Sequence, residues 1–323
     1  MAEEQGVLFL RDEDGEPRLA LFDKDRIRGL LEETFEESDH NLRPVWEGDP
    51  GINRVEVLVT SMHELGKERL EGWPNLKMVS LAFTGYDQVA KEYCKKKGIA
   101  VYYVPGYATQ SVAELTIGLT LSILRKMQRA DASIRAGLWH ASCAPGFELA
   151  KKTVGIVGTG TIGQQTARLF RAFGCSVLGW SRPKTRRSEF IALGGAYVSW
   201  EAIFAQSDIV VLHLAQNSKT KGIVGAKELS WLRDGAVLIN TSRAGLVEEK
   251  ALVRELQEGR IYAGLDVFHN EPVSASDPLP KLDNVVATPH LGFKTDVALE
   301  RLARVTLKNI RRFLDRDPTN RII

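Results

Sequence analysis

Short apolar runs alternate along the chain with longer stretches in which apolar residues recur at helical spacing. The runs are rich in Val, Ile and Leu, which is typical of strands buried in a parallel sheet. The intervening stretches, such as residues 86–97 and 161–173, predict helices. Such alternation favours an α/β fold with helices on both faces of each sheet. The predicted strands are residues 55–60, 76–81, 99–104, 154–157, 176–180, 209–214, 236–240, 261–265 and 285–287.

The pattern changes at Pro105-Gly106, where a predicted strand gives way to a long helical stretch, residues 109–137. A chain of 323 residues is long enough for two hydrophobic cores. We expect the last amphipathic stretch, residues 296–313, to cross back onto the first domain. The prediction is therefore two doubly wound domains with parallel sheets, a discontinuous one of residues 1–105 plus 295–323 and a central one of residues 106–294.

The beginning of the chain adds a different signal. Asp14-Gly15 lies between two apolar runs, residues 7–10 and 19–22. An Asp-Gly pair in this setting predicts a β-hairpin, because it tolerates the positive φ angles of a tight turn. One edge of the first sheet is therefore expected to be antiparallel.

Composition narrows the class of protein. The chain is 44% hydrophobic and 26% charged, with a formal net charge of +2, which gives no reason to expect nucleic acid or acidic membranes as partners. The first residues lack a secretory pattern, and no apolar run approaches the roughly 20 residues of a membrane span. The three cysteines are widely spaced, and no His/Cys/Asp set has metal-ligand spacing. We expect a cytoplasmic protein without a metal.

A glycine fingerprint, Gly158-Thr159-Gly160-Thr161-Ile162-Gly163, follows the strand at residues 154–157 and opens a helix. In this context the first glycine permits a tight turn and the second lets a pyrophosphate approach the backbone. The third packs the helix on the strand, and the N–H groups of the helix start face the negative charge. The central domain is therefore predicted to be a Rossmann dinucleotide-binding domain.

The end of the next strand bears on which dinucleotide binds. An NAD site usually places an acid there, but this chain has Ser181-Arg182-Pro183-Lys184. A serine hydroxyl and a guanidinium suit a ribose 2′-phosphate, which a carboxylate would repel. The pattern favours NADP(H), with NAD(H) still possible if the basic residues form a solvated loop.

Three charged residues follow the later predicted strands: Arg243, Glu271 and His290. The carboxyl ends of parallel strands meet at one edge of a sheet, so all three are expected to face one cleft. Taken singly, each has an ordinary structural interpretation. Their joint order and placement favour catalysis.

From about residue 76 to 310 the chain resembles the D-isomer-specific 2-hydroxyacid dehydrogenases. Several ordered motifs carry this resemblance, which makes it more specific than the glycine fingerprint alone. They are Phe83-Thr84-Gly85-Tyr86-Asp87, Ser111-Val112-Ala113-Glu114, the fingerprint, Asn240-Thr241-Ser242-Arg243-Ala244-Gly245-Leu246-Val247, Leu265-Asp266-Val267-Phe268 through Glu271-Pro272, and Thr288-Pro289-His290.

The resemblance implies a role for each charged residue. Arg243 holds the substrate carboxylate and 2-oxo group, and His290 exchanges a proton with the substrate oxygen. Glu271 pairs with His290 and favours the imidazolium. Backbone N–H groups of Thr84 and Gly85 form a second carboxylate anchor.

The fingerprint, the basic loop and the resemblance together assign the dinucleotide contacts. Among them, the resemblance places Asp266 near the nicotinamide ring. Ala215 and Ala244 depart from the family's common proline and glycine, so loop details are expected to differ there. The assigned contacts are Gly158, Gly160, Thr161, Ile162, Gly163, Ser181, Arg182, Lys184, Leu214, Ala215, Thr241, Ser242, Arg243, Asp266, His290 and Gly292.

The resemblance favours an NADP(H)-preferring reductase of small 2-oxo acids, with glyoxylate and hydroxypyruvate as lead substrates. One alternative is an NAD-dependent enzyme acting on a D-lactate-like acid or 3-phosphoglycerate. Another is a dinucleotide-sensing protein like the corepressors related to this family. The resemblance also implies a homodimer with residues 109–137 at the contact.

Overall fold

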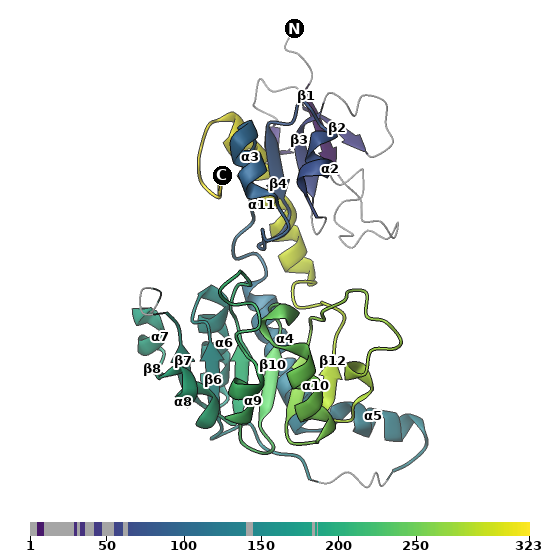
Figure 1. Ribbon diagram of the computed structural model, residues 1–323, viewed down its shortest axis with the longest axis vertical. Helices are drawn as coiled ribbons and strands as arrows, with labels where there is room; N and C mark the ends of the chain where they lie inside the picture. Colours follow the sequence, from purple (N-terminus) through teal and green to yellow (C-terminus); the bar gives the residue numbers. More distant parts are fainter. Residues whose placement is uncertain are drawn as a thin grey trace. The chain divides into compact units, whose positions relative to one another are not determined.

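The computed structural model describes residues 5–9, 29–30, 33–35, 42–46, 55–60, 64–139, 145–182, 185 and 187–323. The chain divides into two compact units, which are coloured along the sequence in Figure 1. The predicted domain boundaries follow residues 105 and 294, and the boundaries of the two units follow Ala108 and Lys294. Unit 1 comprises Met1–Ala108 with Thr295–Ile323, and unit 2 comprises Thr109–Lys294.

Unit 1 is built on a five-stranded sheet in the order β2-β1-β3-β4-β5, and its named strands all pair in parallel. This strand order is a doubly wound one. Helices accompany the strands in sequence, as predicted. The strands are β1 (Gln5–Phe9), β2 (Leu42–Trp46), β3 (Val55–Thr60), β4 (Met78–Leu81) and β5 (Ala100–Tyr102), and the helices are α2 (Lys67–Glu71), α3 (Lys91–Lys97) and α11 (Asp296–Leu314).

The sheet differs from the prediction at β1. Both sides of this strand are occupied by parallel neighbours, β2 and β3, so the expected antiparallel edge does not lie beside it. The Asp14-Gly15 turn itself lies outside the described residues. An apolar run next to a turn signal suggested a hairpin, whereas partners distant in sequence pair with this strand instead.

Antiparallel pairing occurs at the other edge of the sheet, through the last residues of the chain. Ile322 N donates to Val101 O at 2.8 Å, and Tyr103 N donates to Asn320 O at 3.1 Å. The C-terminal residues thereby cover the edge of β5, whose backbone groups would otherwise lack partners.

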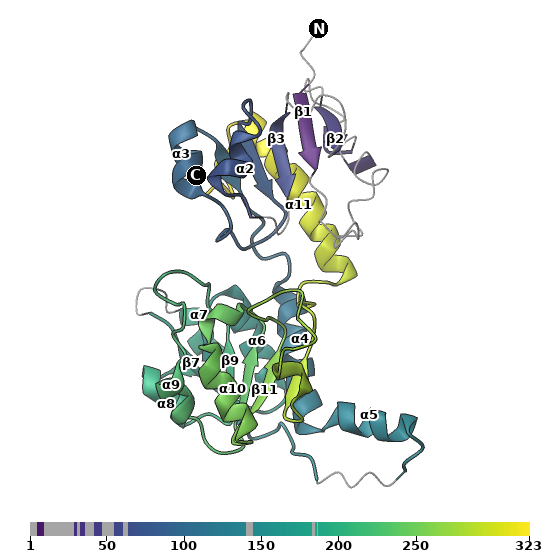
Figure 2. The ribbon, with the colours of Figure 1, turned by 45° about the vertical axis from the view of Figure 1, so that its right-hand side comes forward.

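Helix α11 brings the chain back to unit 1 (Figure 2), and its contacts there include β4. Thr295 caps its first turn by accepting a hydrogen bond from Ala298 N. Its buried face includes Leu302, Leu307 and Ile310. Periodic apolar residues are the pattern from which this helix was predicted, and the threonine cap is an addition from the structure.

Unit 2 contains a seven-stranded sheet in the order β12-β11-β10-β9-β6-β7-β8, again with parallel pairs. The direction of winding reverses between β6 and β9, which is the switch point of a Rossmann fold. The predicted α/β class is confirmed in both units. The strands are β6 (Thr153–Val157), β7 (Ser176–Trp180), β8 (Gly195–Tyr197), β9 (Ile209–Leu212), β10 (Val237–Asn240), β11 (Tyr262–Leu265) and β12 (Val285–Ala287).

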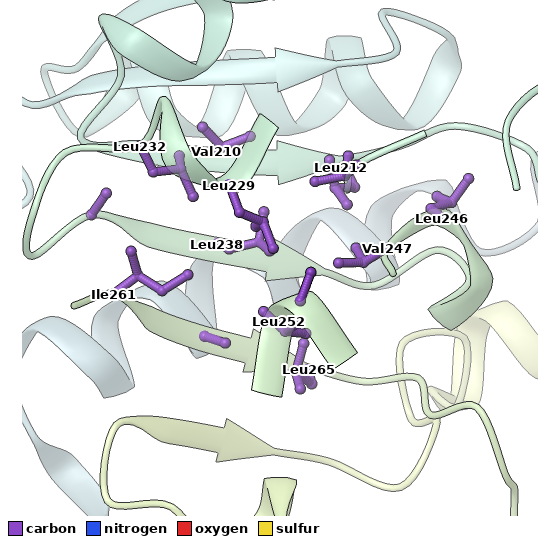
Figure 3. Close-up of a cluster of buried hydrophobic side chains, with 14 of the residues drawn as sticks. Val210, Leu212, Leu229, Leu232, Leu238, Leu246, Val247, Leu252, Ile261 and Leu265 are labelled. Atoms are coloured by element: carbon purple, nitrogen blue, oxygen red, sulfur yellow. The ribbon is translucent and has the colours of Figure 1, made fainter. Parts of the chain in front are cut away.

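Two apolar clusters pack on the two faces of this sheet. Figure 3 shows the first, in which Val210 and Leu238 of the central strands meet Leu229 and Leu252 of two helices. The second cluster contains buried residues of α4 and α6. Burial on both faces explains why the strands read as continuous apolar runs. The helices are α4 (Thr109–Leu124), α5 (Met127–Arg135), α6 (Thr161–Ala172), α7 (Ser188–Ala192), α8 (Trp200–Ala205), α9 (Ala226–Ser230) and α10 (Glu249–Gln257).

The long helix predicted for residues 109–137 is two helices, α4 and α5. Lys126 lies between them with φ of 53°, a left-handed conformation that ends the first helix. No residue of α5 is buried within the chain. Among the described helices, none is long and apolar enough to cross a membrane.

Candidate active site

The glycine loop follows β6 at the switch point. Gly158 has φ of 102°, and a Cβ at this position would overlap the carbonyl oxygen of His213. A Cβ at Gly163 would overlap the carbonyl oxygen of Gly158. Both positions therefore require glycine for the fold itself.

Gly160 requires a different explanation, because a Cβ there would have no atom within 4 Å. This glycine precedes α6, which begins at Thr161 and has no side-chain cap. The first N–H groups of a helix lack intrahelical partners and favour an anion. Open space beside such a helix start fits the pyrophosphate of a dinucleotide.

The loop after β7 carries the residues expected at the ribose. Ser181 is only 6% exposed, and its Oγ accepts a hydrogen bond of 3.0 Å from Thr159 N. Arg182 is exposed, and its carbonyl accepts from Thr185 N at 2.8 Å. Lys184 lies outside the described residues. The hydrogen bond from Thr159 N to Ser181 thus stabilises the glycine loop, and sequence patterns did not reveal this contact.

The loop after β9 contains Leu214 and Ala215, two predicted cofactor contacts. It is held by Thr220, whose hydroxyl donates to Ala215 O at 2.7 Å. His213 precedes them and bonds Thr166 Oγ1 through Nε2 at 2.9 Å. Burial lowers the pKa of His213 to about 3, so this histidine is neutral and structural.

A short turn after β10 positions Arg243. The buried Asn240 donates from Nδ2 to Arg243 O at 2.9 Å and accepts from Ser242 N at 3.1 Å. Ser242 Oγ also donates to Leu212 O on the neighbouring strand at 2.7 Å. Thr241 Oγ1 lies 3.1 Å from Thr116 Oγ1 of α4. The Asn240 side chain thus stabilises the turn through two hydrogen bonds to its backbone. The sequence motif did not indicate this role.

Glu271 and His290 form a hydrogen-bonded pair. Glu271 Oε2 lies 2.7 Å from His290 Nδ1, and Glu271 Oε1 accepts from Phe268 N at 2.9 Å. Burial acts to raise the pKa of the Glu271 carboxyl. The hydrogen bond and charge of His290, the Phe268 N–H and the charge of Arg243 outweigh this effect and hold that pKa below its usual value. The three predicted charged residues therefore share one electrostatic environment.

Asp266 supports the backbone on which His290 sits. Its carboxylate accepts hydrogen bonds from Thr288 Oγ1 at 2.6 Å, Leu291 N at 2.7 Å and Gly292 N at 2.8 Å. Its backbone oxygen accepts from His290 N at 2.9 Å, where His290 has φ of 53°. Burial raises the pKa of Asp266, although these hydrogen bonds oppose the shift. The arrangement holds the histidine in an otherwise disfavoured backbone conformation.

Thr84 and Gly85, the predicted second anchor, lie in unit 1 after β4. Thr84 Oγ1 donates to Val104 O at 2.7 Å, so this hydroxyl holds the loop together. Val104 N in turn donates to Phe83 O at 3.0 Å. No group of three or more His, Cys, Asp or Glu side chains among the described residues is placed to hold a metal.

Comparison with known proteins identifies the family. Residues 117–292 match the NAD-binding domain of the D-isomer-specific 2-hydroxyacid dehydrogenases. A glyoxylate reductase of Thermococcus litoralis is 38% identical over 80% of both chains. A hydroxypyruvate reductase of Thermotoga maritima is 37% identical over 78% of this chain and 82% of its own. A D-3-phosphoglycerate dehydrogenase of Methanocaldococcus jannaschii is 35% identical over 81% of this chain but 50% of its own length.

Solved structures share the whole fold. The D-lactate dehydrogenase of Aquifex aeolicus, complexed with NAD and lactic acid, has a TM-score of 0.83 and 28% identity over 98% of both chains. An acyclic imino acid reductase in complex with NADPH and D-Arg has the same TM-score and identity, over 99% of this chain and 100% of its own. One of these neighbours is thus complexed with NAD and the other with NADPH. The chain belongs to the D-isomer-specific 2-hydroxyacid dehydrogenases, oxidoreductases that interconvert 2-hydroxy and 2-oxo acids with NAD(P).

Proposed function

We propose that this enzyme is an NADP(H)-preferring reductase of small 2-oxo acids, with glyoxylate and hydroxypyruvate as its main substrates. The observation that supports the reaction type is the 2.7 Å hydrogen bond between Glu271 Oε2 and His290 Nδ1. The charge of Arg243 acts on the same carboxyl group and helps to lower its pKa. The substrate assignment draws on the relatives named glyoxylate reductase and hydroxypyruvate reductase.

In this proposal Arg243 binds the substrate carboxylate with its planar guanidinium and so orients the 2-oxo group. Because Glu271 holds Nδ1 of His290, the proton passes from Nε2 to the 2-oxo oxygen. Glu271 stabilises the imidazolium before transfer and fixes the ring. The bound nicotinamide supplies the hydride that C2 receives. A carbonyl thereby becomes a secondary alcohol, or a primary alcohol from glyoxylate, and His290 is left neutral.

The cofactor preference rests on the end of β7. The exposed Arg182 has no ion-pair or hydrogen-bond partner for its guanidinium among the described residues, and no acid stands at this strand end. A guanidinium in this position binds the 2′-phosphate of NADP(H). The proposal therefore favours NADP(H), with NAD(H) as the alternative.

Initial rates with glyoxylate and hydroxypyruvate, each with NADPH and NADH, test the proposal. Pyruvate and 3-phosphohydroxypyruvate serve as the competing substrates. We expect the highest kcat/KM with NADPH and one of the two lead substrates. Faster turnover of pyruvate or 3-phosphohydroxypyruvate would transfer the assignment to the alternatives. Dinucleotide binding without turnover of any 2-oxo acid would favour a sensing role.

We also propose a homodimer formed through unit 2. Large apolar side chains are exposed on α5 and the residues around it, where Trp139 is 81% exposed. Such a concentration on one projecting segment is typical of an interface. The exposed apolar residues are Met127, Ile134, Leu138, Trp139 and Phe147.

Cytoplasmic localisation stays a prediction.

A further inference from the structure

Three hydroxyl groups form a continuous chain beside the glycine loop. Thr159 Oγ1 lies 2.8 Å from Ser181 Oγ and 2.6 Å from the phenol oxygen of Tyr197. The same phenol oxygen accepts a hydrogen bond of 2.9 Å from Arg187 N. One tyrosine of β8 therefore connects the glycine loop, the end of β7 and the far side of the basic loop.

The direction of these hydrogen bonds follows from the donors available. Arg187 N can only donate to Tyr197, and a phenol is a stronger donor than an aliphatic alcohol, which favours the direction in which Tyr197 donates to Thr159. Thr159 then donates its own hydroxyl proton to Ser181. Ser181 Oγ already accepts from Thr159 N at 3.0 Å. Its lone pairs are thus occupied, and among the described residues its proton has no acceptor, so it is available to a bound ligand.

Ser181 is the outer end of this row of hydroxyl groups, and it lies where an anion is expected. Ser181 retains 6% exposure and is followed by the exposed Arg182. A phosphate offers only acceptors, so it selects the outward direction of all three hydroxyl protons. A ribose 2′-hydroxyl can donate as well as accept, and it gains less from this arrangement.

We propose that Tyr197 is a positioning residue for the cofactor's 2′-phosphate, acting through Thr159 and Ser181 without touching the dinucleotide. This inference rests on the proposed NADP(H) preference and deepens it. The tyrosine holds Arg187 by its backbone and orients the hydroxyl proton of Ser181. Its ring, packed 5.1 Å from that of Phe190, anchors the phenol in the fold.

Titration calorimetry with two nucleotide fragments tests this role independently of turnover. Adenosine 2′,5′-bisphosphate carries the 2′-phosphate, and adenosine 5′-monophosphate lacks it. Tyr197→Phe keeps the ring and removes only the hydroxyl. We expect it to weaken the bisphosphate about 3- to 10-fold, the range of one net hydrogen bond, and to change the monophosphate less than twofold.

A second variant and a control sharpen the measurement. Thr159→Val breaks the same chain at its middle, so it should weaken the bisphosphate similarly, and the double variant should lose little more than either single one. Tyr102→Phe removes a 2.8 Å hydrogen bond to Asp317 O in unit 1 and should affect neither fragment. Melting temperatures verify that each variant is folded.

The outcomes separate the two proposals. Equal affinity of the unmodified protein for both fragments would refute the NADP(H) preference and this inference with it. A clear preference for the bisphosphate that survives Tyr197→Phe would overturn the inference alone. Equal weakening of both fragments would also overturn it, because the tyrosine would then only support the glycine loop.

Discussion

The hydrogen bond between Glu271 and His290 links the ionisation of Glu271 to the stability of the fold. The folded-state pKa of Glu271 is lowered, because His290, Phe268 N and Arg243 outweigh the opposing effect of burial. The carboxylate therefore stabilises the folded protein above about pH 4.5, the model-peptide range, and this contribution is lost as pH falls through the lower folded-state pKa.

Glu271→Gln should accordingly destabilise the protein near pH 7 and much less near pH 3. Urea unfolding of both proteins across this range measures the difference in free energy of unfolding. Since glutamine can still accept from Phe268 N, the change reports mainly the charge. A difference that grows toward low pH would contradict the direction of the pKa shift.

His290→Ala should reduce kcat by about 100- to 10,000-fold, the usual contribution of a general acid, while dinucleotide affinity stays nearly constant. Stopped-flow turnover and fluorescence titration with NADPH measure the two quantities separately. His269→Ala removes an exposed histidine of the preceding loop and provides the control. Retained turnover, or a loss of NADPH binding large enough to explain the lower rate, would refute the acid–base assignment.

In the glycine turn between β6 and α6, we expect two glycines of the same motif to have different roles, one in cofactor binding and one in folding. Gly160→Ala adds a methyl group to open space, so the melting temperature should barely change while NADPH binding weakens at least tenfold. Gly163→Ala places a methyl group on the carbonyl oxygen of Gly158 and should destabilise the fold. Calorimetric scanning and NADPH titration of both variants distinguish these roles. Similar melting temperatures in the two variants would contradict the structural account.

Elements with a strong apolar pattern were predictable, and elements defined by pairing were not. Strands β3, β7 and β12 have the predicted limits. Strand β8 was missed because Gly195-Ala196-Tyr197 is short and weakly apolar, and its identity comes from pairing with β7. The break between α4 and α5 escaped for a related reason, since Lys126 gives no sign of a left-handed conformation.

The same distinction applies to the candidate site. Arg243, Glu271 and His290 could be named because each follows a strand within a recognisable motif, and the structure pairs Glu271 with His290. Asn240 and Tyr197 could not be identified as supports, because their hydrogen bonds depend on backbone turns and on partners in other segments. In this chain, sequence patterns indicated the candidate reacting groups more readily than the groups that hold them.

For the whole molecule, the exposed apolar residues of α5 predict self-association. Ile134→Asp should shift the protein from dimer to monomer in sedimentation velocity experiments at micromolar concentration. Ile191→Asp is the matched control, because this isoleucine of α7 is 60% exposed and that of α5 is 55% exposed. A monomeric unmodified protein, or equal effects of both substitutions, would refute the proposed interface.

The discontinuity of unit 1 governs the order in which the protein can be made. Its strand β4 needs Thr306 O as a partner for Ser80, and the edge of β5 needs Ile322, yet both residues follow all of unit 2 in the chain. At about 5–20 residues per second, a ribosome takes roughly 10–40 s to synthesise residues 109–294. Unit 2 emerges without interruption and can fold during that time. The unit encoded first is therefore the last to be completed, and its open sheet edge must be kept from other chains until synthesis ends.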